Sequence, residues 1–322
     1  MRSKYKEKAG SVEKNMTTHL LGIEHRDLIV DCLSRFSPEI SEHTFTNLFV
    51  WRHSRPIHFT RINDTIVFLI SISAGKKQKL FLFGPPIGNL AISDIVSVFQ
   101  GDLAGTIRLP RSHAESIAGT GIPIRNDRDN DDYVYSVKDL GTLAGRNYAK
   151  KRNQIKKCLQ RYHCEYEPIS KALIPECRAM QEQWCNEHSC TMDHGLCNEF
   201  SAINEMFDYF FELGLIGGVV RIDGKVQAFA IGERLHPGTA VCHFEKAMHG
   251  MQGLGQLINS WFARYGLSDF EFVNREQDLG IPGLRQAKQS YHPHHMVKKY
   301  TVIFSGDDFV LGATAQGCAE QD

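Results

Sequence analysis

A histidine, a glutamate and a lysine stand close together in the sequence His243-Phe244-Glu245-Lys246. The surrounding residues are typical of a strand, and side chains alternate between the two faces of a strand, so His243 and Glu245 should share one face. Imidazole and carboxylate groups transfer protons and an ammonium group stabilises negative charge, which makes all three candidate catalytic groups. The competing interpretation is a structural ion pair between Glu245 and Lys246.

A second group of polar residues lies at 274–278, where a predicted strand ends in Asn-Arg-Glu-Gln-Asp. Open α/β sheets bind ligands beyond the carboxyl ends of their strands, so this position favours a site for a charged ligand. A short predicted helix at 282–289 adds an arginine and a lysine. The candidates from this segment are Arg275 and Arg285 for stabilising charge, and Asn274, Asp278 and Lys288 for binding the substrate.

Residues 142–163 contain seven Lys or Arg residues and no Asp or Glu. Tyr148, Ile155, Leu159 and Tyr162 recur at helical spacing, which predicts a helix that packs with one stripe and exposes its cations. Such a surface would bind the phosphates of a nucleic acid or another anionic ligand, whereas a solvated bridging helix is the alternative. The candidate phosphate-binding residues are Arg146, Lys150, Lys151, Arg152, Lys156 and Lys157.

A glycine-rich turn at 250–255 follows a predicted strand and opens a predicted helix. Backbone N–H groups at a helix N-terminus bind phosphate, and glycine lets a ligand approach closely, so Gly253 and Gly255 are further candidates. A turn that needs its glycines only for close packing is the alternative.

Five Cys and His residues lie between Cys185 and Cys197, within 13 residues. Structural zinc sites use separated ligand pairs, and this packed order matches none of their usual spacings, so we expect no metal. The nine cysteines of the chain, an odd number, suit a reducing compartment better than a disulfide framework.

Composition sets the broad class. The 322-residue chain carries 37 Lys and Arg against 37 Asp and Glu, and this zero balance excludes a histone-like polycation. The length favours two domains. No apolar run approaches the roughly 20 residues that cross a bilayer, and the charged first residues do not resemble a secretion signal. We therefore expect a soluble, cytoplasmic protein.

The predicted elements form two halves with a similar order of strands and helices, which indicates a mixed α/β (α+β) fold built from two related domains. Asp223-Gly224 predicts a hairpin between 216–222 and 226–233, with 240–246 as the next strand. The expected divisions are a loose tail at 1–19, a first domain at 20–140, a basic connecting helix at 141–163, a second domain at 164–305 and a C-terminal tail at 306–322.

Six separated stretches resemble one family. They are 41–52 (SEHTFTNLFVWR), 148–153 (YAKKRN), 228–233 (AFAIGE), 243–247 (HFEKA), 274–280 (NREQDLG) and 283–291 (GLRQAKQSY). Together they resemble bacterial proteins similar to the C-terminal domain of phosphatidylglycerol lysyltransferase. The resemblance implies two GNAT-like domains in tandem, related to the Fem peptidyltransferases that take amino acids from aminoacyl-tRNA. Trp51 and Tyr291, which lie in these stretches, join the substrate-binding candidates.

The resemblance and the residues together predict an enzyme that transfers an activated aminoacyl or acyl group to an amine or hydroxyl. The expected donor is aminoacyl-tRNA, and the expected acceptor is a small molecule or a lipid head group. Acetyl transfer from coenzyme A is one alternative, because GNAT enzymes hold its pyrophosphate at a strand–glycine turn–helix. A non-catalytic module that binds tRNA or an anionic small molecule is another.

Overall fold

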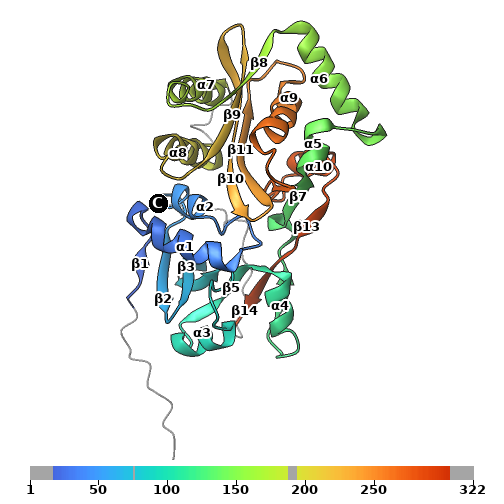
Figure 1. The fold of residues 1–322 in the computed structure, drawn as a ribbon. Coiled ribbons are helices and arrows are strands. Elements are labelled where there is room, and N and C mark those ends of the chain that lie inside the picture. The colour runs from blue at the N-terminus through green and yellow to red at the C-terminus, as the bar shows by residue number, and fades with distance from the viewer. Residues whose placement is uncertain (1–16, 75–76, 188–193, 305–322) are drawn as a thin grey trace, which may run out of the picture.

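Two seven-stranded sheets organise the chain, of which the computed structural model describes residues 17–74, 77–187 and 194–304 (Figure 1). The first sheet has the order β1-β2-β3-β4-β5-β14-β6 and the second the order β13-β7-β12-β11-β10-β9-β8. The strands are β1 (His19–Leu20), β2 (Ile57–Ile62), β3 (Thr65–Ala74), β4 (Lys77–Phe83), β5 (Leu103–Pro110), β6 (Ile124–Asn126), β7 (Asp132–Ser136), β8 (Cys164–Pro168), β9 (Ile216–Ile222), β10 (Lys225–His236), β11 (Thr239–Ala247), β12 (Phe272–Asn274), β13 (His295–Val297) and β14 (Lys299–Ile303).

Helices cover both sheets. They are α1 (Arg26–Phe36), α2 (Phe45–Val50), α3 (Ile92–Phe99), α4 (Arg111–Ile117), α5 (Val137–Thr142), α6 (Ala149–Arg161), α7 (Ile174–Glu187), α8 (His194–Asp208), α9 (Leu254–Trp261) and α10 (Pro282–Gln289). On the second sheet, α7 and α8 cover one face, while α5, α6 and α9 lie on the other (Figure 1). The mixed α+β class expected from the sequence is confirmed.

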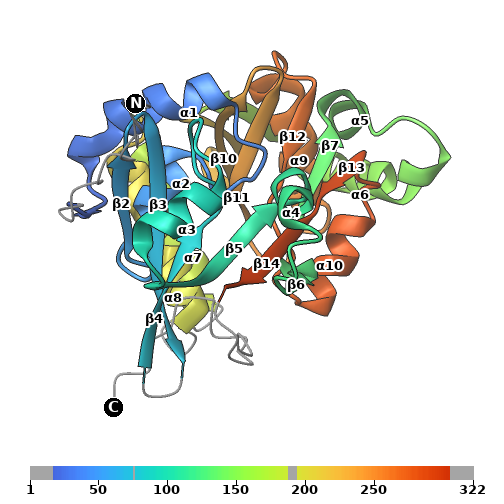
Figure 2. The same cartoon turned by 90° about the horizontal axis from the view of Figure 1, so that it is seen from below.

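The two sheets exchange strands. β7, which precedes the basic helix, pairs with β12 and β13 in the second sheet. β14, at the end of the described chain, pairs with β5 and β6 in the first sheet (Figure 2). The sequence divisions at 20–140 and 164–305 therefore need correction, because the pairing moves 132–136 into the second unit and 299–303 into the first. The tails expected at 1–19 and 306–322 lie almost wholly outside the described residues.

The hairpin expected at Asp223-Gly224 is confirmed. β9 and β10 are antiparallel, with Ile222 opposite Lys225, and β11 is the next strand. Asp223 and Gly224 have φ angles of 51° and 76°, the left-handed conformation that a tight two-residue hairpin turn requires at both positions.

A shared hydrophobic core joins the two units. One cluster contains Phe45 and Phe49 of α2, Phe207 of α8, and Phe229 and Ile231 of β10. A separate cluster fills the opposite face of the second sheet, under α5, α6 and α9. The second sheet is therefore buried on both faces, and polar side chains that point into it must find partners there.

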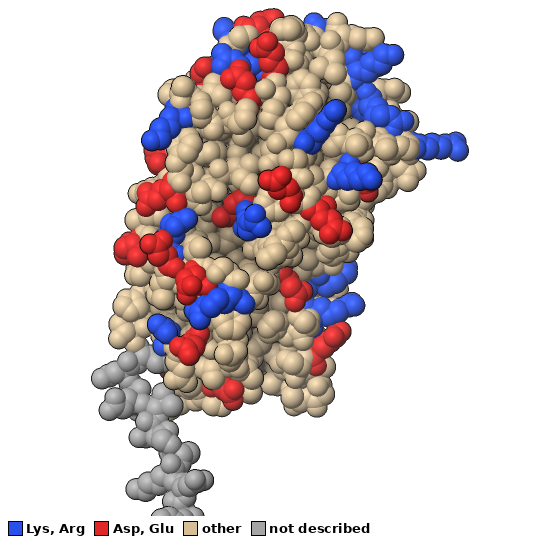
Figure 3. All heavy atoms as spheres, in the orientation of Figure 1, with Lys and Arg blue, Asp and Glu red and all other residues tan. Residues whose placement is uncertain are grey.

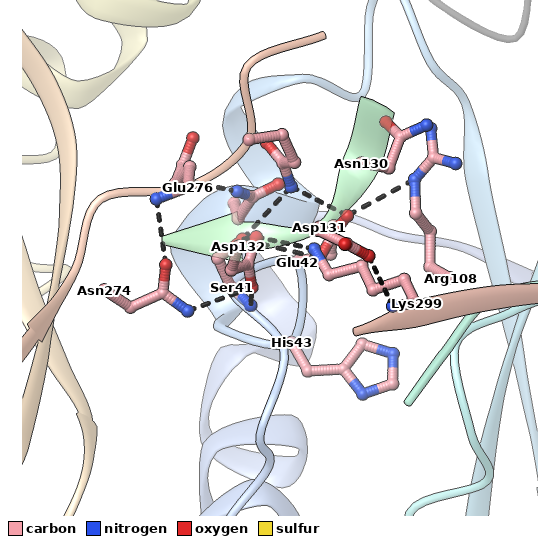
Figure 4. A network of polar contacts seen from close by, with 12 residues as sticks. Ser41, Glu42, His43, Arg108, Asn130, Asp131, Asp132, Asn274, Glu276 and Lys299 are labelled. Atoms are coloured by element: carbon pink, nitrogen blue, oxygen red, sulfur yellow. Dashed lines mark hydrogen bonds and ion pairs between the residues drawn. The ribbon is translucent and has the colours of Figure 1, made fainter. Parts of the chain in front are cut away.

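A buried ion cluster lies where the strands change sheets (Figure 4). Lys299 Nζ, at the start of β14, lies 2.5 Å from Glu42 Oε2 and 2.6 Å from Asp132 Oδ1, at the start of β7. Ser41 Oγ and Asn274 Nδ2 each donate a 2.9 Å hydrogen bond to Asp132. All three charged groups are at most 1% exposed. The cluster therefore ties β7, β12 and β14 to the loop before α2.

Electrostatics sets the charge state of this cluster. Burial opposes the ionised form of Glu42, but Lys299 and Arg108 outweigh it and hold the pKa of Glu42 below its usual value. Burial raises the pKa of Asp132, and Lys299 offsets this only in part. The single ammonium of Lys299 thus compensates two carboxylates, with help from the Arg108 guanidinium, whose Nε lies 3.3 Å from Glu42.

Lys299→Met should lower the free energy of unfolding by about 3–5 kcal/mol, because it leaves two buried carboxylates without their shared cation. Lys298→Met is the matched control: Lys298 lies 3.0 Å from Asp131 but is 34% exposed, so its loss should cost less than about 1 kcal/mol. Urea unfolding measures both. Equal losses in the two variants would contradict the role given to the buried cluster.

Candidate active site

The candidate site lies where β11 and β12 diverge. The two strands pair in parallel over three positions only, Thr239 to Val241 with Phe272 to Asn274. β11 then continues to Ala247, whereas β12 ends at Asn274 and the residues that follow it leave the sheet. Where the strands separate, Glu245 of β11 and Arg275, which follows β12, come into contact.

A bulge in β11 separates two residues expected on one face. The register between β10 and β11 shifts between Ile231 and Gly232, which leaves His243 without an opposite residue. His243 contacts Glu233 and Glu276, whereas Glu245 contacts Arg275 and Asn259. The expectation that His243 and Glu245 share one face is therefore wrong, because strict alternation fails at a bulge.

Arg275 and Glu245 form the central ion pair of the site. Arg275 Nη2 lies 3.2 Å and 3.3 Å from the two carboxylate oxygens, and Asn259 Nδ2 donates to the same carboxylate at 2.9 Å. The guanidinium lies 5.1 Å from the ring centroid of Tyr291 and 5.6 Å from that of Tyr135. Its Nη1 is buried and has no hydrogen-bond partner among the described residues.

Two lysines lie beside this pair. Lys151 Nζ, from α6, donates to Ser290 Oγ at 2.8 Å and lies 3.5 Å from the ring centroid of Tyr291. Lys288 Nζ, from α10, donates to the carbonyl of Arg275. Burial, and then the charge of Arg275, lower the pKa of each lysine from 10.5 to about 8. The site therefore holds three cationic groups next to one carboxylate.

His243 lies on the side of the sheet that faces the first unit. Its Nε2 is 2.9 Å from Glu233 and its Nδ1 is 2.8 Å from Glu276, which also accepts a 3.1 Å hydrogen bond from Asn47 of α2. Burial opposes the charged imidazole, but the two carboxylates raise the pKa of His243 to about 9. At neutral pH this residue is a buried cation that links the units.

Other predicted site residues lie in separate contacts. Arg285 binds both oxygens of Asp278, at 2.7 Å and 2.8 Å, and Asp278 also accepts from Tyr133 and Arg128. Lys246 Nζ lies 2.8 Å from Glu199 and 3.7 Å from the ring centroid of Trp184. Trp51 contacts Phe244, with ring centroids 6.0 Å apart. Asn274, which binds Asp132, belongs to the buried ion cluster.

The basic helix presents its cations to solvent. Figure 3 shows Lys and Arg side chains gathered over the region of α6, which Figure 1 places at the upper right. Arg146, Lys150, Arg152, Lys156 and Lys157 are exposed, while Lys151 is half-buried. The acidic residues at 127–131 pair with other cations, such as Arg108, Arg285 and Lys298, rather than with α6.

The glycine turn packs directly against α6. A surface pocket of about 440 Å³ is lined by Lys150, Asn153, Gln154 and Lys157 of the helix and by Gln252 of the turn. At Gly253, which has a φ of 89°, a Cβ atom would lie 2.1 Å from the carbonyl oxygen of Gln154. Close packing therefore requires this glycine, whereas a Cβ at Gly255 would meet nothing within 4 Å.

The described ranges also bear on metal binding and on membrane crossing. These residues contain no group of three or more His, Cys, Asp or Glu side chains placed to hold a metal. Residues 188–193, in the middle of the cysteine and histidine cluster, lie outside them. No helix in the described part of the chain is long and apolar enough to cross a bilayer.

Sequence reasoning missed four contributors to these contacts: Tyr135, Asn259, Glu233 and Glu276. Tyr135 and Tyr133 alternate on β7 with residues of the other face, a pattern visible in the sequence. Glu276 lies in the polar segment at 274–278, but its contact with His243 depends on how β11 and β12 are placed. Glu233 and Asn259 gave no local signal, since their contacts arise from the bulged pairing of β10 with β11 and from the packing of α9.

The comparisons place the chain in a family. The family model described as "Phosphatidylglycerol lysyltransferase, C-terminal" matches residues 34–303. This match covers most of the sequence, and the chain belongs to that family. No curated protein matches the sequence.

Solved structures support the same fold. A conserved protein of unknown function from Bacteroides thetaiotaomicron VPI-5482 is 29% identical, with a TM-score of 0.81 over 90% of this chain and 100% of that one. L-PGS from Bacillus licheniformis is 12% identical, with a TM-score of 0.61 over 86% and 91%. FemX is 6% identical, with a TM-score of 0.57 over 89% and 97%. The fold is a tandem of GNAT-like units, as the sequence predicted.

The charge of His243 makes a testable contribution to stability. Because its pKa is raised from 6.5 to about 9, the stabilisation is complete below pH 6.5 and is lost as the pH rises through 9. The unfolding free energy of the wild type should therefore fall, relative to His243→Gln, by up to about 3 kcal/mol across this window.

Urea unfolding at pH 6, 7.5 and 9.5 measures the difference between wild type and variant. His163→Gln serves as the control for the loss of a histidine, because His163 is 79% exposed beside Glu165 and lies outside the contacts of Glu233 and Glu276. A wild-type to His243→Gln difference that stays constant with pH would contradict the charged state of His243.

Proposed function

We propose that this protein is an aminoacyl transferase that moves an amino acid from aminoacyl-tRNA to an amine or hydroxyl acceptor. The observation that carries the proposal is the position of α6, whose exposed side is rich in cations and whose Lys151 reaches Ser290 and Tyr291 beside the Arg275–Glu245 pair. A polyanionic donor bound along α6 would therefore end next to the groups best suited to acyl transfer. The cytoplasm, which contains aminoacyl-tRNA, is the proposed location.

The site offers the two groups that acyl transfer needs. The attacking amine or hydroxyl loses a proton, and we assign Glu245 as the acceptor of that proton. The ester carbonyl becomes a tetrahedral oxyanion, and the unpartnered Nη1 of Arg275 is placed to donate to it. No covalent enzyme intermediate is required, because the acceptor attacks the activated ester directly. The tetrahedral intermediate then collapses by breaking the ester C–O bond, and the proton taken up by Glu245 passes to the departing ribose oxygen of the tRNA.

We assign the remaining candidates to positioning. The contact between Asp278 and Arg285 holds the loop after Arg275. Asn274, the residue before Arg275, is anchored by its hydrogen bond to Asp132. His243 links the loop to α2 through Glu276 and Asn47. Lys246 and Trp51 contact the shared hydrophobic core rather than the Arg275–Glu245 pair.

Coenzyme A is the second candidate donor, because Lys150 and Lys157 line a pocket together with Gln252 of the glycine turn that precedes α9. Two features weigh against it. Gly253 packs directly against the backbone of Gln154, so close packing already explains why a glycine is needed there. Gly250 lies where GNAT enzymes usually have Gln or Arg. The pocket fits equally well as the place where one phosphate of a longer polyanion binds.

The dependence of binding on salt distinguishes the two donors. Binding of tRNA should weaken steeply with salt, and Lys150→Ala combined with Lys157→Ala should make the log–log slope shallower by about 1.4–1.8, or 0.7–0.9 per lost phosphate contact. Fluorescence anisotropy over a salt series measures this slope. Coenzyme A, with its few phosphates, should give a shallow slope.

Lys171→Ala is the matched control, because Lys171 is exposed, lies 5.6 Å from the ring centroid of Phe211 and precedes α7 in the sequence. Figure 1 shows α7 on the opposite face of the second sheet from α6. It should leave the slope unchanged. A tRNA slope that is the same in the double variant and the wild type would contradict the proposed donor surface, and tight coenzyme A binding with a shallow slope would favour the second donor.

A further inference from the structure

Three aromatic side chains meet at the surface of the second unit. They are Tyr166 of β8, Trp261 at the end of α9 and Tyr265, four residues further along the chain. The ring centroid of Tyr166 lies 5.1 Å from that of Tyr265 and 6.4 Å from that of Trp261. The rings of Trp261 and Tyr265 are also 6.4 Å apart. All three distances are usual for aromatic pairs, and we call this group the aromatic platform.

The backbone holds the aromatic platform in place. α9 continues into a π-helical turn (Phe262–Gly266), in which the N–H of Leu267 donates to the carbonyl of the first residue at 3.0 Å. The hydroxyl of Tyr166 is buried, and a Cβ atom added at Gly218 or Gly266 would lie 3.0 Å or less from it. Close packing against these two glycines therefore fixes the ring of Tyr166. Turns of this π-helical kind are frequent at functional sites.

The aromatic platform is exposed to solvent. Tyr265 is 50% exposed, and Tyr166 and Trp261 are each partly exposed. A single exposed apolar side chain is normal at a protein surface, whereas several adjoining ones indicate a binding surface. The rings are also rigid, so a ligand that stacks on them loses little conformational entropy of the protein.

Positive charge lies next to the aromatic platform. The exposed Arg264 guanidinium lies 5.3 Å from the ring centroid of Tyr265. Trp261 packs against the same hydrophobic cluster that contains Cys158 of α6, and α6 and α9 lie on one face of the second sheet (Figure 1). Tyr166 follows the exposed Arg161 by five residues, a reach of at most about 18 Å. The platform therefore adjoins the cationic helix.

The carboxylates of β8 lie on the other face of the sheet. Side chains alternate along a strand, and β8 pairs with β9 without a shift in register, so Glu165 and Glu167 point away from Tyr166. Glu167 lies 3.6 Å from Arg221, which also lies 3.2 Å from Glu176 of α7. α7 covers the face opposite to α9 (Figure 1). These acids would therefore not repel an anionic ligand on the platform.

We propose that the aromatic platform stacks an unpaired base of an RNA whose phosphates lie along α6. Every base has an aromatic face, and aromatic side chains beside a cationic surface bind single-stranded nucleic acid with little dependence on sequence. Arg264 is placed to pair with a phosphate next to the stacked base. The proposal rests on the proposed function and deepens it, because it names a part of the RNA donor that is held outside the Arg275–Glu245 pair.

Fluorescence anisotropy of the full chain with two RNA probes tests the proposal. One probe is a short oligoadenylate, and the other is a blunt duplex RNA of the same length. Tyr265→Ala should weaken binding of the single strand about 5- to 150-fold, because it removes one stacking contact. The duplex should lose less than about twofold, because its bases are already paired and stacked. The salt dependence of single-strand binding should stay unchanged, since the lost ring carries no charge.

Phe211→Ala is the matched control. Phe211 is also 50% exposed, and it follows α8, which covers the other face of the second sheet (Figure 1). Its loss should leave the binding of both probes unchanged. Tyr265→Phe keeps the ring and should bind like the wild type. Circular dichroism verifies that each variant is folded.

Equal affinity of the single strand for Tyr265→Ala and the wild type would overturn the proposal, as would an equal loss for the duplex. Vesicles of phosphatidylglycerol and phosphatidylcholine give the remaining outcome. If Tyr265→Ala weakens binding to these vesicles and leaves RNA binding intact, the platform contacts a membrane and the proposal is wrong.

The proposed transferase function fails separately. Stacking of the single strand without aminoacyl transfer would reject the transferase and keep the aromatic platform as an RNA site. Aminoacyl transfer by a chain in which Tyr265→Ala leaves single-strand binding unchanged would keep the transferase and reject the platform.

Discussion

The buried ammonium group of Lys299 stabilises the place where two strands change from one sheet to the other. Lys299 lies between Glu42 and Asp132. Glu42 belongs to the first unit, Asp132 to β7, which enters the second sheet, and Lys299 to β14, which returns to the first sheet. A charge buried this deeply is tolerated only if its partners are fixed. The exchange of β7 and β14 between the sheets supplies that fixation, and the shared hydrophobic core joins the two units as well.

The same cluster sets the geometry of the candidate active site. Asn274 donates to Asp132, so the last residue of β12 is anchored on one face of the second sheet. Arg275 follows directly and projects to the opposite face, where it meets Glu245, while Glu276 turns back to His243. Three consecutive residues thus connect the buried ion cluster, the proposed transfer site and the link to α2. Substitutions in the cluster would be expected to disturb the site as well as stability.

Local patterns in the sequence were sufficient for the elements but not for their assembly. The Asp223-Gly224 turn, the basic helix and the strand containing Glu245 were all predicted, because turn chemistry and periodicity act over a few residues. The strand exchange could not be predicted from local patterns, since β14 pairs with β5, almost 200 residues earlier in the sequence. The bulge at His243 likewise depends on the register between β10 and β11. The sequence therefore could not predict that Glu233 and Glu276 are the partners of His243.

The most direct test is the rate at which the chain removes the amino acid from aminoacyl-tRNA in the presence of phosphatidylglycerol vesicles, measured in a single turnover. If Glu245 accepts the proton, Glu245→Gln should slow transfer by at least about 100-fold while its amide oxygen keeps the contacts to Arg275 and Asn259. Glu199→Gln, which alters the partner of Lys246 away from the site, should leave the rate close to that of the wild type. Equal rates in the wild type and Glu245→Gln would contradict a transfer centre at the divergence of β11 and β12.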